Sequence, residues 1–243
     1  MKYITLFETA AAYNAATLDL PNVSLVEETM SVSYNPYVDP YGGHDYVEIG
    51  GLKWATINVG ANSIIDKGLY FQWGDTQGYT TDQVGSGEGK KYFDYNWSDY
   101  KWTEDYGETF TKYNDNDYTV LQPSDDAVIA NWGGNWRMPT TAEYVALGNA
   151  VNTVWTTDYQ GSGVAGIICT DKTDSSKILF FPACGHCRNG NVVSVGNWGY
   201  YWSSSLNSSY VKNAYYMEIY NGSVSWKSST SRCEGFPVRA VAD

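Results

Sequence analysis

The segment from residue 213 to residue 228, NAYYMEIYNGSVSWKS, constrains the fold more than any other part of this sequence. Asn221-Gly222 stands between two runs in which apolar and polar residues alternate, and this pattern predicts a β-hairpin with a two-residue turn. Such a turn fixes which residues of the two strands face each other. The predicted pairs are Tyr220 with Ser223, Ile219 with Val224, Glu218 with Ser225, Met217 with Trp226, and Tyr216 with Lys227.

The predicted hairpin has two different faces, because successive side chains of a strand point to opposite sides. The apolar face, which we expect on the core, consists of Met217, Ile219, Val224 and Trp226. The opposite face is both aromatic and polar, as a ligand-contacting surface is, and consists of Tyr216, Glu218, Tyr220, Ser223, Ser225 and Lys227. A solvated sheet face with scattered tyrosines is an equally good interpretation of this pattern.

The whole C-terminal region has a similar composition, since Tyr, Trp, Ser and Asn make up more than half of residues 186–234. Antibody combining sites are enriched in the same residue types. Tyr and Trp supply rigid contact area there, while Ser and Asn supply adaptable hydrogen bonds. The composition agrees with a binding surface in this region.

Charge and hydropathy exclude two kinds of partner. The 243 residues include 15 Lys and Arg against 27 Asp and Glu, a formal net charge of −12 at pH 7. Nucleic-acid binding draws on clustered Lys and Arg, so we expect no nucleic acid as partner. The sequence has no run of 18 apolar residues, so we expect no membrane insertion.

The start of the sequence lacks the features of a classical secretory signal peptide, and we expect the mature chain to begin at Met1.

A Pro- and Gly-containing stretch at residues 36–45 predicts a linker, with a domain boundary near its end. Residues 1–44 are then a small N-terminal segment, in which residues 8–19 predict a short helix. Residues 45–243 form the main domain.

Two short helices are expected within the main domain. Ser124 can cap one of them, with Asp125 and Asp126 in its first turn. Thr140 and Glu143 form a capping box that opens the other. Because short strands and long loops make up the remainder, the predicted class is α+β.

Five strings, taken together, resemble a known family. They are GLKWATINVGA (51–61), WGGNWRMPTTAE (132–143), FFPACG (180–185), GYYWSSS (199–205) and GFPVRAV (235–241). In this order they resemble the major paralogous domain family first noted in Fibrobacter and abundant in Bacteroidetes and their phages. The resemblance implies a C-type-lectin-like fold with two short helices, long loops and the C-terminal hairpin.

The chain is also similar to a subset of that family, the variable proteins of diversity-generating retroelements, in which mutagenesis rewrites codons near the C-terminus. Here GYYWSSS and GFPVRAV bracket the Tyr-, Ser- and Asn-rich tail. The resemblance implies a variable ligand-binding surface at about residues 186–234. Its candidate residues are Arg188, Asn191, Trp198, Tyr210, Lys212, Tyr216, Glu218, Tyr220, Ser223, Ser225, Lys227, Ser229, Arg232 and Glu234, with Ser228 and Cys233 among the positions expected to vary.

The function implied is non-enzymatic recognition of a bacterial surface protein or glycan. Tyr210, Tyr216 and Tyr220 would anchor the ligand, with Glu218, Lys227 and Arg232 setting charge specificity at the rim. The expected location is the tail of a Bacteroides phage or an extracellular surface, with attachment through residues 1–44. The alternative is a structural protein whose aromatic tail forms a homo-oligomer interface.

The sequence disfavours catalysis and metal binding. Formylglycine-generating enzymes share the expected fold and use a reactive cysteine pair, but Cys184 and Cys187 are followed by a turn sequence rather than by a helix. A zinc site normally needs two close ligand pairs, and only this one exists. Asp115 and its neighbours lack calcium-loop spacing, and two histidines are too few for a hydrolase triad. We therefore expect no enzyme activity, metal or cofactor.

The tryptophans divide into two groups. Most lie in the five family strings and are expected in the core; they include Trp54, Trp73, Trp132, Trp136 and Trp202. Trp97 and Trp102 lie in an acidic, aromatic insertion, which is either a second contact surface or a loop folded onto its own domain.

Overall fold

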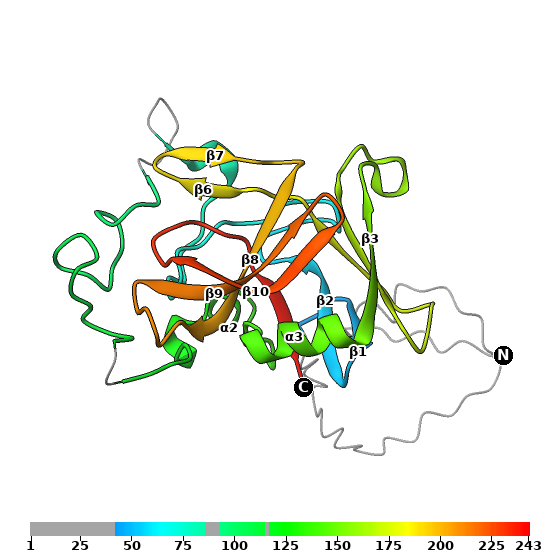
Figure 1. The fold of residues 1–243 in the computed structure, drawn as a ribbon, viewed down its shortest axis with the longest axis horizontal. Coiled ribbons are helices and arrows are strands. Elements are labelled where there is room, and N and C mark those ends of the chain that lie inside the picture. Colours follow the sequence, from blue (N-terminus) through cyan, green and yellow to red (C-terminus); the bar gives the residue numbers. More distant parts are fainter. Residues whose placement is uncertain (1–41, 86–92, 115–116) are drawn as a thin grey trace, which may run out of the picture. The chain divides into compact units, whose positions relative to one another are not determined.

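The computed structural model describes residues 42–85, 93–114 and 117–243, which consist mainly of β-strands and the loops between them (Figure 1). The N-terminal segment expected at residues 1–44, with its helix at residues 8–19, lies almost wholly outside the described residues. The strands are β1 (Tyr46–Ile49), β2 (Leu52–Asn58), β3 (Val151–Thr156), β4 (Gly166–Asp171), β5 (Ile178–Pro182), β6 (His186–Arg188), β7 (Asn191–Val193), β8 (Trp198–Leu206), β9 (Asn213–Tyr220), β10 (Ser223–Ser231) and β11 (Arg239–Ala242).

The helices are few and short. They are α2 (Ala127–Trp132), α3 (Thr141–Ala150) and the 3-10 turns η1 (Thr81–Gln83), η2 (Pro123–Asp125) and η3 (Tyr159–Gly161). Strand accounts for 39% of the structure and helix for 13%, so β-structure predominates three to one. Within the part of the chain that the structure describes, no helix is long and apolar enough to cross a membrane.

The described strands form four small antiparallel sheets rather than one large sheet. Their strand orders are β1-β2-β11, β3-β4-β5, β8-β9-β10 and β6-β7. This arrangement corrects our fold prediction: the class is close to α+β, but the expected C-type-lectin-like fold is wrong. The five strings that suggested it mark core packing and turns, which are local features. They do not determine how distant strands pair into sheets.

Both predicted helices exist, and one begins later than expected. Ser124 lies inside η2, and Asp126 is the actual N-cap of α2, where its carboxylate accepts hydrogen bonds from the backbone N–H groups of Val128 and Ile129. The Thr140–Glu143 capping box of α3 is present as predicted. Asp126 replaces Ser124 because the chain after Pro123 first makes one 3-10 turn.

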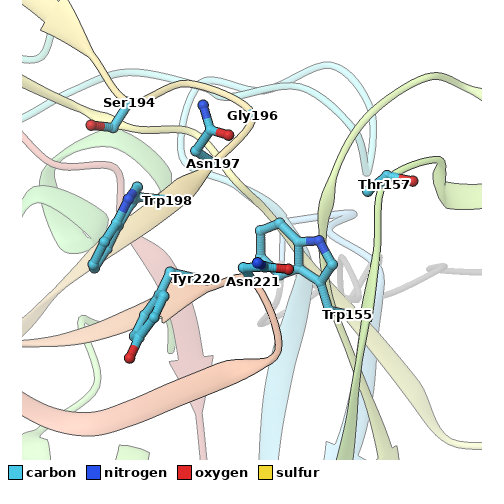
Figure 2. A pocket seen from close by; sticks show the side chains of 8 residues that line it. All are labelled: Trp155, Thr157, Ser194, Gly196, Asn197, Trp198, Tyr220 and Asn221. Atoms are coloured by element: carbon cyan, nitrogen blue, oxygen red, sulfur yellow. The ribbon is translucent and has the colours of Figure 1, made fainter.

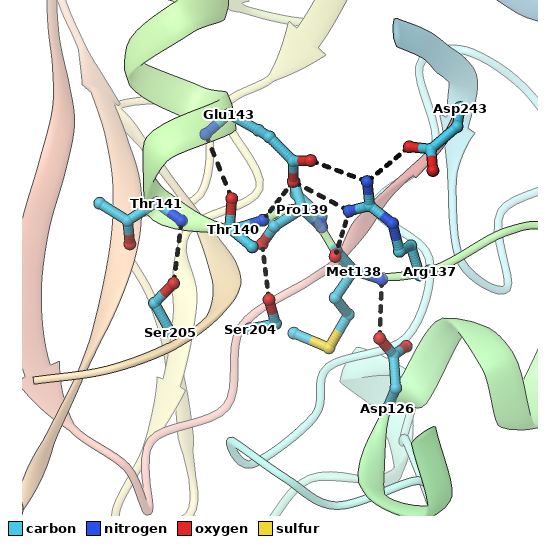
Figure 3. A network of polar contacts seen from close by, with 10 residues as sticks. All are labelled: Asp126, Arg137, Met138, Pro139, Thr140, Thr141, Glu143, Ser204, Ser205 and Asp243. Atoms are coloured by element: carbon cyan, nitrogen blue, oxygen red, sulfur yellow. Dashed lines mark hydrogen bonds and ion pairs between the residues drawn. The ribbon is translucent and has the colours of Figure 1, made fainter. Parts of the chain in front are cut away.

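A polar network ties the start of α3 to the C-terminus (Figure 3). The Arg137 guanidinium donates to both carboxylate oxygens of Glu143, at 2.9 and 2.7 Å, and to the Asp243 side chain at 2.8 Å. The backbone N–H of Thr141 donates to the Ser205 hydroxyl of β8 at 3.1 Å. The network therefore joins α3, β8 and the last residue of the chain.

The interior is largely aromatic, as the composition indicated. Trp54, Trp73, Trp136 and Trp202 are fully buried, which confirms their prediction as core residues. The remaining predicted core residue, Trp132, is half-buried and its ring stacks on the imidazole of His44, with centroids 3.7 Å apart.

The acidic, aromatic insertion folds back onto its own domain. Its Trp97 and Trp102 are partly buried and pack against a small cluster formed by Tyr100, Phe110 and Cys233. The structure thus favours the second of the two interpretations of this insertion.

One buried cation lies where the sheets meet. Arg239 of β11 donates from Nε to the Asn58 side chain at 2.9 Å, from Nη1 to the Ala55 carbonyl at 3.1 Å and from Nη2 to the Phe180 carbonyl at 3.1 Å. Its guanidinium also lies 4.6 Å from the ring centroid of Phe181. Burial lowers the pKa of Arg239, and the hydrogen bonds compensate for part of that desolvation.

We predict that Glu143→Gln destabilises the protein by about 1–2 kcal/mol at pH 7, because the amide loses the charge-assisted pair with Arg137. Burial alone raises the pKa of Glu143, but hydrogen bonds from Arg137 and Thr140 outweigh it, so the pKa is lowered from its ordinary value of 4.5. The stability due to the carboxylate is therefore present above pH 4.5 and is lost as the pH falls through the lowered pKa.

Urea unfolding of both proteins between pH 7 and pH 3 measures this effect. The difference between wild type and Glu143→Gln should shrink as the pH falls. Glu104→Gln is the matched control, because Glu104 is exposed and has no hydrogen bond or ion pair with any described residue. A difference that stays constant with pH would contradict the prediction.

Candidate ligand-binding site

The C-terminal hairpin forms with the predicted turn and, close to the turn, with the predicted register. Tyr220 pairs with Ser223, Ile219 with Val224 and Glu218 with Ser225. The register then shifts, so that Tyr216 faces Ser228 and Tyr215 faces Ser229. A bulge at Trp226 and Lys227, where β10 has one residue more than β9, overturns the predicted pairs of Met217 with Trp226 and Tyr216 with Lys227.

The apolar face of the hairpin is confirmed. Met217 and Ile219 are fully buried in the main core, and Val224 and Trp226 pack against it partly buried. Helix α3 comes so close that a Cβ on Gly148 would lie 2.5 Å from Nε1 of Trp226. Glycine at this helical position therefore allows the helix to cover the sheet.

The opposite face continues across β8, because residues paired directly on antiparallel strands share a face. We call this surface the aromatic face. Its three rows, from the hairpin turn inward, are Trp198–Tyr220–Ser223, Tyr200–Glu218–Ser225 and Trp202–Tyr216–Ser228.

Exposure falls steadily from the first row of the aromatic face to the third. Tyr220 in the first row is 38% exposed, whereas Tyr216 in the third row is 8% exposed. The cause is Phe236, whose ring stacks on Trp202 with centroids 4.1 Å apart and lies 5.1 Å from Tyr216. Tyr216 is thus mainly a packing residue, and our prediction of it as an exposed anchor is wrong.

The middle row contains the polar part of the face. The Ser228 hydroxyl lies 3.3 Å from a carboxylate oxygen of Glu218 and 2.8 Å from the Ser225 hydroxyl. Burial, together with the charges of Glu218 and Glu234, raises the pKa of Tyr200 to about 12. Tyr200 therefore keeps its proton at neutral pH and can donate a hydrogen bond.

A buried carboxylate, Glu234, borders the middle of the face. One of its oxygens lies 3.6 Å from Nη1 of Arg188 and accepts from the Thr230 hydroxyl at 3.4 Å. Burial raises its pKa, and Arg188 and Thr230 oppose that rise only in part. The ring of His186 lies 4.6 Å from that of Tyr200, and burial together with the charge of Arg188 lowers its pKa to about 4, so this imidazole is neutral at pH 7.

A pocket of about 550 Å³ opens at the first row of the aromatic face (Figure 2). We call it the hairpin pocket. Its lining residues are Trp155, Thr157, Ser194, Gly196, Asn197, Trp198, Tyr220 and Asn221. The Trp198 and Tyr220 rings are stacked, with centroids 4.3 Å apart and planes 15° from parallel. Figure 2 shows these two rings beside each other, with Trp155 on the β3 side of the pocket.

Seven of the predicted site residues lie on or beside the aromatic face, besides the covered Tyr216. They are Arg188, Trp198, Glu218, Tyr220, Ser223, Ser225 and Glu234. The structure therefore brings together about half of the expected surface.

The bulge places two predicted residues on the other side of the sheet. The ammonium group of Lys227 lies 4.7 Å from the ring centroid of Tyr215. Tyr215 directly precedes Tyr216 in β9, so its side chain points away from the aromatic face. Ser229 pairs with Tyr215 and accepts a hydrogen bond from the Asn207 amide at 3.1 Å. The prediction of Lys227 on the ligand-contacting face is wrong for this reason.

Arg232 is not at a rim but fully buried. Its guanidinium lies 3.8 Å from the ring centroid of Phe110 and donates from Nη1 to the Tyr113 carbonyl at 2.9 Å. Burial lowers its pKa. Because this cation holds the aromatic insertion against the domain, its predicted role in charge specificity is wrong.

Three further predicted residues lie outside the aromatic face: Lys212 and Tyr210 on the β8–β9 loop, and Asn191 at the start of β7. Lys212 pairs with Glu108 at 2.7 Å, and the Asn191 amide donates to the Asn189 carbonyl in the β6–β7 turn at 2.7 Å. Tyr210 is 55% exposed in the β8–β9 loop.

Sequence reasoning missed Tyr200 and the pocket residues Trp155, Asn197 and Asn221. Tyr200 belongs to the framework string GYYWSSS, but its alternation with Trp198 is a usable signal. The sequence predicts Asn221 only as a turn residue. No pattern in the sequence indicates that the end of β3, which contains Trp155, lies close to the hairpin turn.

The four cysteines of the chain are buried free thiols. Burial raises the pKa of Cys184 to about 11 and those of Cys169 and Cys233 to about 12, and it also raises the pKa of Cys187. Thiolates are therefore scarce at neutral pH. Among the described residues, no group of three or more His, Cys, Asp or Glu side chains is arranged to hold a metal ion.

The comparison with family models covers this part of the chain. A model described as a domain of unknown function (DUF8237) matches residues 168–241, from β4 to β11, and so includes the whole β8-β9-β10 sheet. No curated protein and no solved structure matches the chain.

We predict that all four thiols of the native protein react slowly with Ellman's reagent at pH 8, because each is buried and protonated. The same thiols should react within the mixing time in 6 M guanidinium chloride. Absorbance of the released thiolate measures both rates. A rapidly reacting native thiol would contradict this burial and favour an oxidase instead.

We predict that Glu234→Gln is at least as stable as wild type at pH 7, because a buried carboxylate is replaced by a neutral group of the same shape. Because burial raises the pKa of Glu234, folding favours its protonated form more than the unfolded chain does. Wild-type stability due to this group therefore falls as the pH rises from 4.5 through the raised pKa. Urea unfolding at several pH values should show that this fall is absent in the variant. A loss of more than about 1 kcal/mol at pH 7 would contradict the prediction.

Proposed function

We propose that this protein is a non-enzymatic binding protein that recognises a bacterial surface ligand through the aromatic face. The observation that carries the proposal is the convergence of Trp198, Tyr200, Glu218 and Tyr220 on one side of a three-stranded sheet. This side is open in its first two rows and is backed by a packed core.

The residue chemistry of the face supports binding rather than catalysis. Stacked aromatic rings offer rigid contact area at a low entropic cost, and the neighbouring hydroxyls and carboxylates supply directional hydrogen bonds. The sheet holds these side chains in fixed positions, so that little order needs to be gained on binding. The raised pKa values of the cysteines also remove the most obvious nucleophiles from reaction at neutral pH.

We further propose, from the family resemblance, that the protein is a variable protein of a diversity-generating retroelement, carried on a phage tail or another extracellular surface. The nucleotide sequence beside the gene tests this. A reverse-transcriptase gene and a near-identical template repeat, differing only at adenines, should accompany it. Their absence would contradict the retroelement origin but not ligand binding by the aromatic face.

We predict that Tyr220→Ala weakens binding of the labelled protein to intact Bacteroidetes cells at least about tenfold, because an exposed aromatic anchor is lost from the first row. Flow cytometry across a panel of strains measures the binding. Tyr106→Ala is the matched control, since Tyr106 is 73% exposed and lies outside the aromatic face. Equal binding by both variants would contradict the proposed site.

Size-exclusion chromatography of the same variants separates this function from the structural alternative. A homo-oligomer interface on the aromatic face predicts that Tyr220→Ala dissociates the assembly. Unchanged elution together with reduced cell binding supports ligand recognition.

A further inference from the structure

The hairpin pocket combines three aromatic side chains with neutral polar groups. Trp155, Trp198 and Tyr220 supply the rings, and Asn197, Asn221, Ser194 and Thr157 supply amides and hydroxyls. Its volume of about 550 Å³ lies within the range of about 300–1,000 Å³ that is typical of small-molecule sites.

The pocket lining carries no formal charge. None of the eight residues that line it is Asp, Glu, Lys, Arg or His. This is notable in a chain of net charge −12, whose other surfaces have many carboxylates. An anionic or cationic ligand would lose its hydration on entering the pocket without gaining a counter-charge, which is costly. The ligand that fits is therefore neutral.

The polar groups of the pocket are available to a ligand. Within the described part of the chain, the side chains of Asn197, Asn221, Ser194 and Thr157 make no hydrogen bond. Asn197 and Thr157 are exposed. An amide both donates and accepts hydrogen bonds, as does a hydroxyl, so these groups match a ligand with several hydroxyls.

The backbone around these side chains is held in place. Ser194 has a φ of +63° and Asn221 a φ of +20°, conformations that are uncommon for residues other than glycine. Trp198 N–H donates to the Ser194 carbonyl at 2.9 Å, and Asn197 N–H donates to the same oxygen at 3.1 Å. A compact turn therefore carries Ser194, Asn197 and Trp198 to the pocket wall as one unit.

We propose that the hairpin pocket binds a neutral carbohydrate unit of a glycan. The aliphatic C–H face of a sugar ring packs on an aromatic ring such as the exposed Tyr220, while its hydroxyls bond to amides of the Asn197 type. The inference rests on the proposed function, because it assigns a ligand class to the pocket at the open end of the aromatic face. Of the two expected partners, a bacterial surface protein and a glycan, the inference selects the glycan.

Saturation-transfer NMR with the full-length protein tests the inference. The probes are methyl glycosides of glucose, galactose, mannose, fucose and N-acetylglucosamine at millimolar concentration, with glucuronic acid and N-acetylneuraminic acid as charged counterparts. We expect saturation of the C–H protons of at least one neutral glycoside and weaker saturation of the acids. Saturation of none of the probes, or a preference for the acids, would overturn the inference.

Variants locate the binding. Asn197→Ala should weaken the affinity for the responding glycoside about tenfold, because it removes hydrogen bonds to the sugar without removing a bond within the protein. Asn152→Ala, at an exposed position of β3 outside both the pocket and the aromatic face, is the matched control and should bind as wild type. Near-UV circular dichroism verifies folding, and Trp155→Phe provides a second, milder pocket variant. Unchanged affinity in both pocket variants would overturn the inference.

The two proposals can fail separately. One outcome is that cell binding depends on Tyr220, is not reduced by Asn197→Ala, and is accompanied by no NMR response to any glycoside. This outcome refutes sugar binding in the hairpin pocket and leaves recognition by the aromatic face intact. A glycoside response without any cell binding refutes the proposed receptor function and leaves the pocket assignment intact.

Discussion

The buried guanidinium of Arg239 is the interaction on which the arrangement of the sheets depends. It bonds to β2 through Ala55 and Asn58 and to β5 through Phe180. Two of the four sheets, β1-β2-β11 and β3-β4-β5, therefore meet around one cation. Burying a charge is costly unless hydrogen bonds compensate for its lost hydration, so these contacts oppose a displacement of β2, β5 and β11 relative to one another.

Those parts of the fold that depend on neighbouring residues could be predicted from the sequence. Asn221-Gly222 predicted the hairpin turn, and the Thr140–Glu143 pair predicted the start of α3, because each signal acts over only a few residues. The grouping of strands into four sheets could not be predicted, since it depends on pairings such as β2 with β11 across most of the chain. Short similarity strings carried no information on those pairings.

For the candidate site, too, the local strand pattern could be predicted from the sequence, whereas features that depend on distant parts of the chain could not. Alternation placed Glu218 and Tyr220 on a common face, and the structure agrees. One extra residue in β10 then reversed the side on which Lys227 lies, and strand periodicity alone does not reveal such a bulge. Arg232 illustrates a second difficulty: a charged residue among serines suggests an exposed position, yet it lies against the rings of Tyr100 and Phe110 from the insertion and of the core residue Trp73.

The gradient of exposure across the aromatic face has a consequence for how the protein can evolve. In the first row, a side chain such as Tyr220 contacts solvent, so substitutions there have little effect on folding. In the third row, Tyr216 and Trp202 pack on Phe236, and substitutions there reduce stability. Mutational tolerance and the proposed ligand contacts thus coincide at the hairpin turn. If the aromatic face binds a ligand as proposed, new specificities can arise there without loss of the native fold.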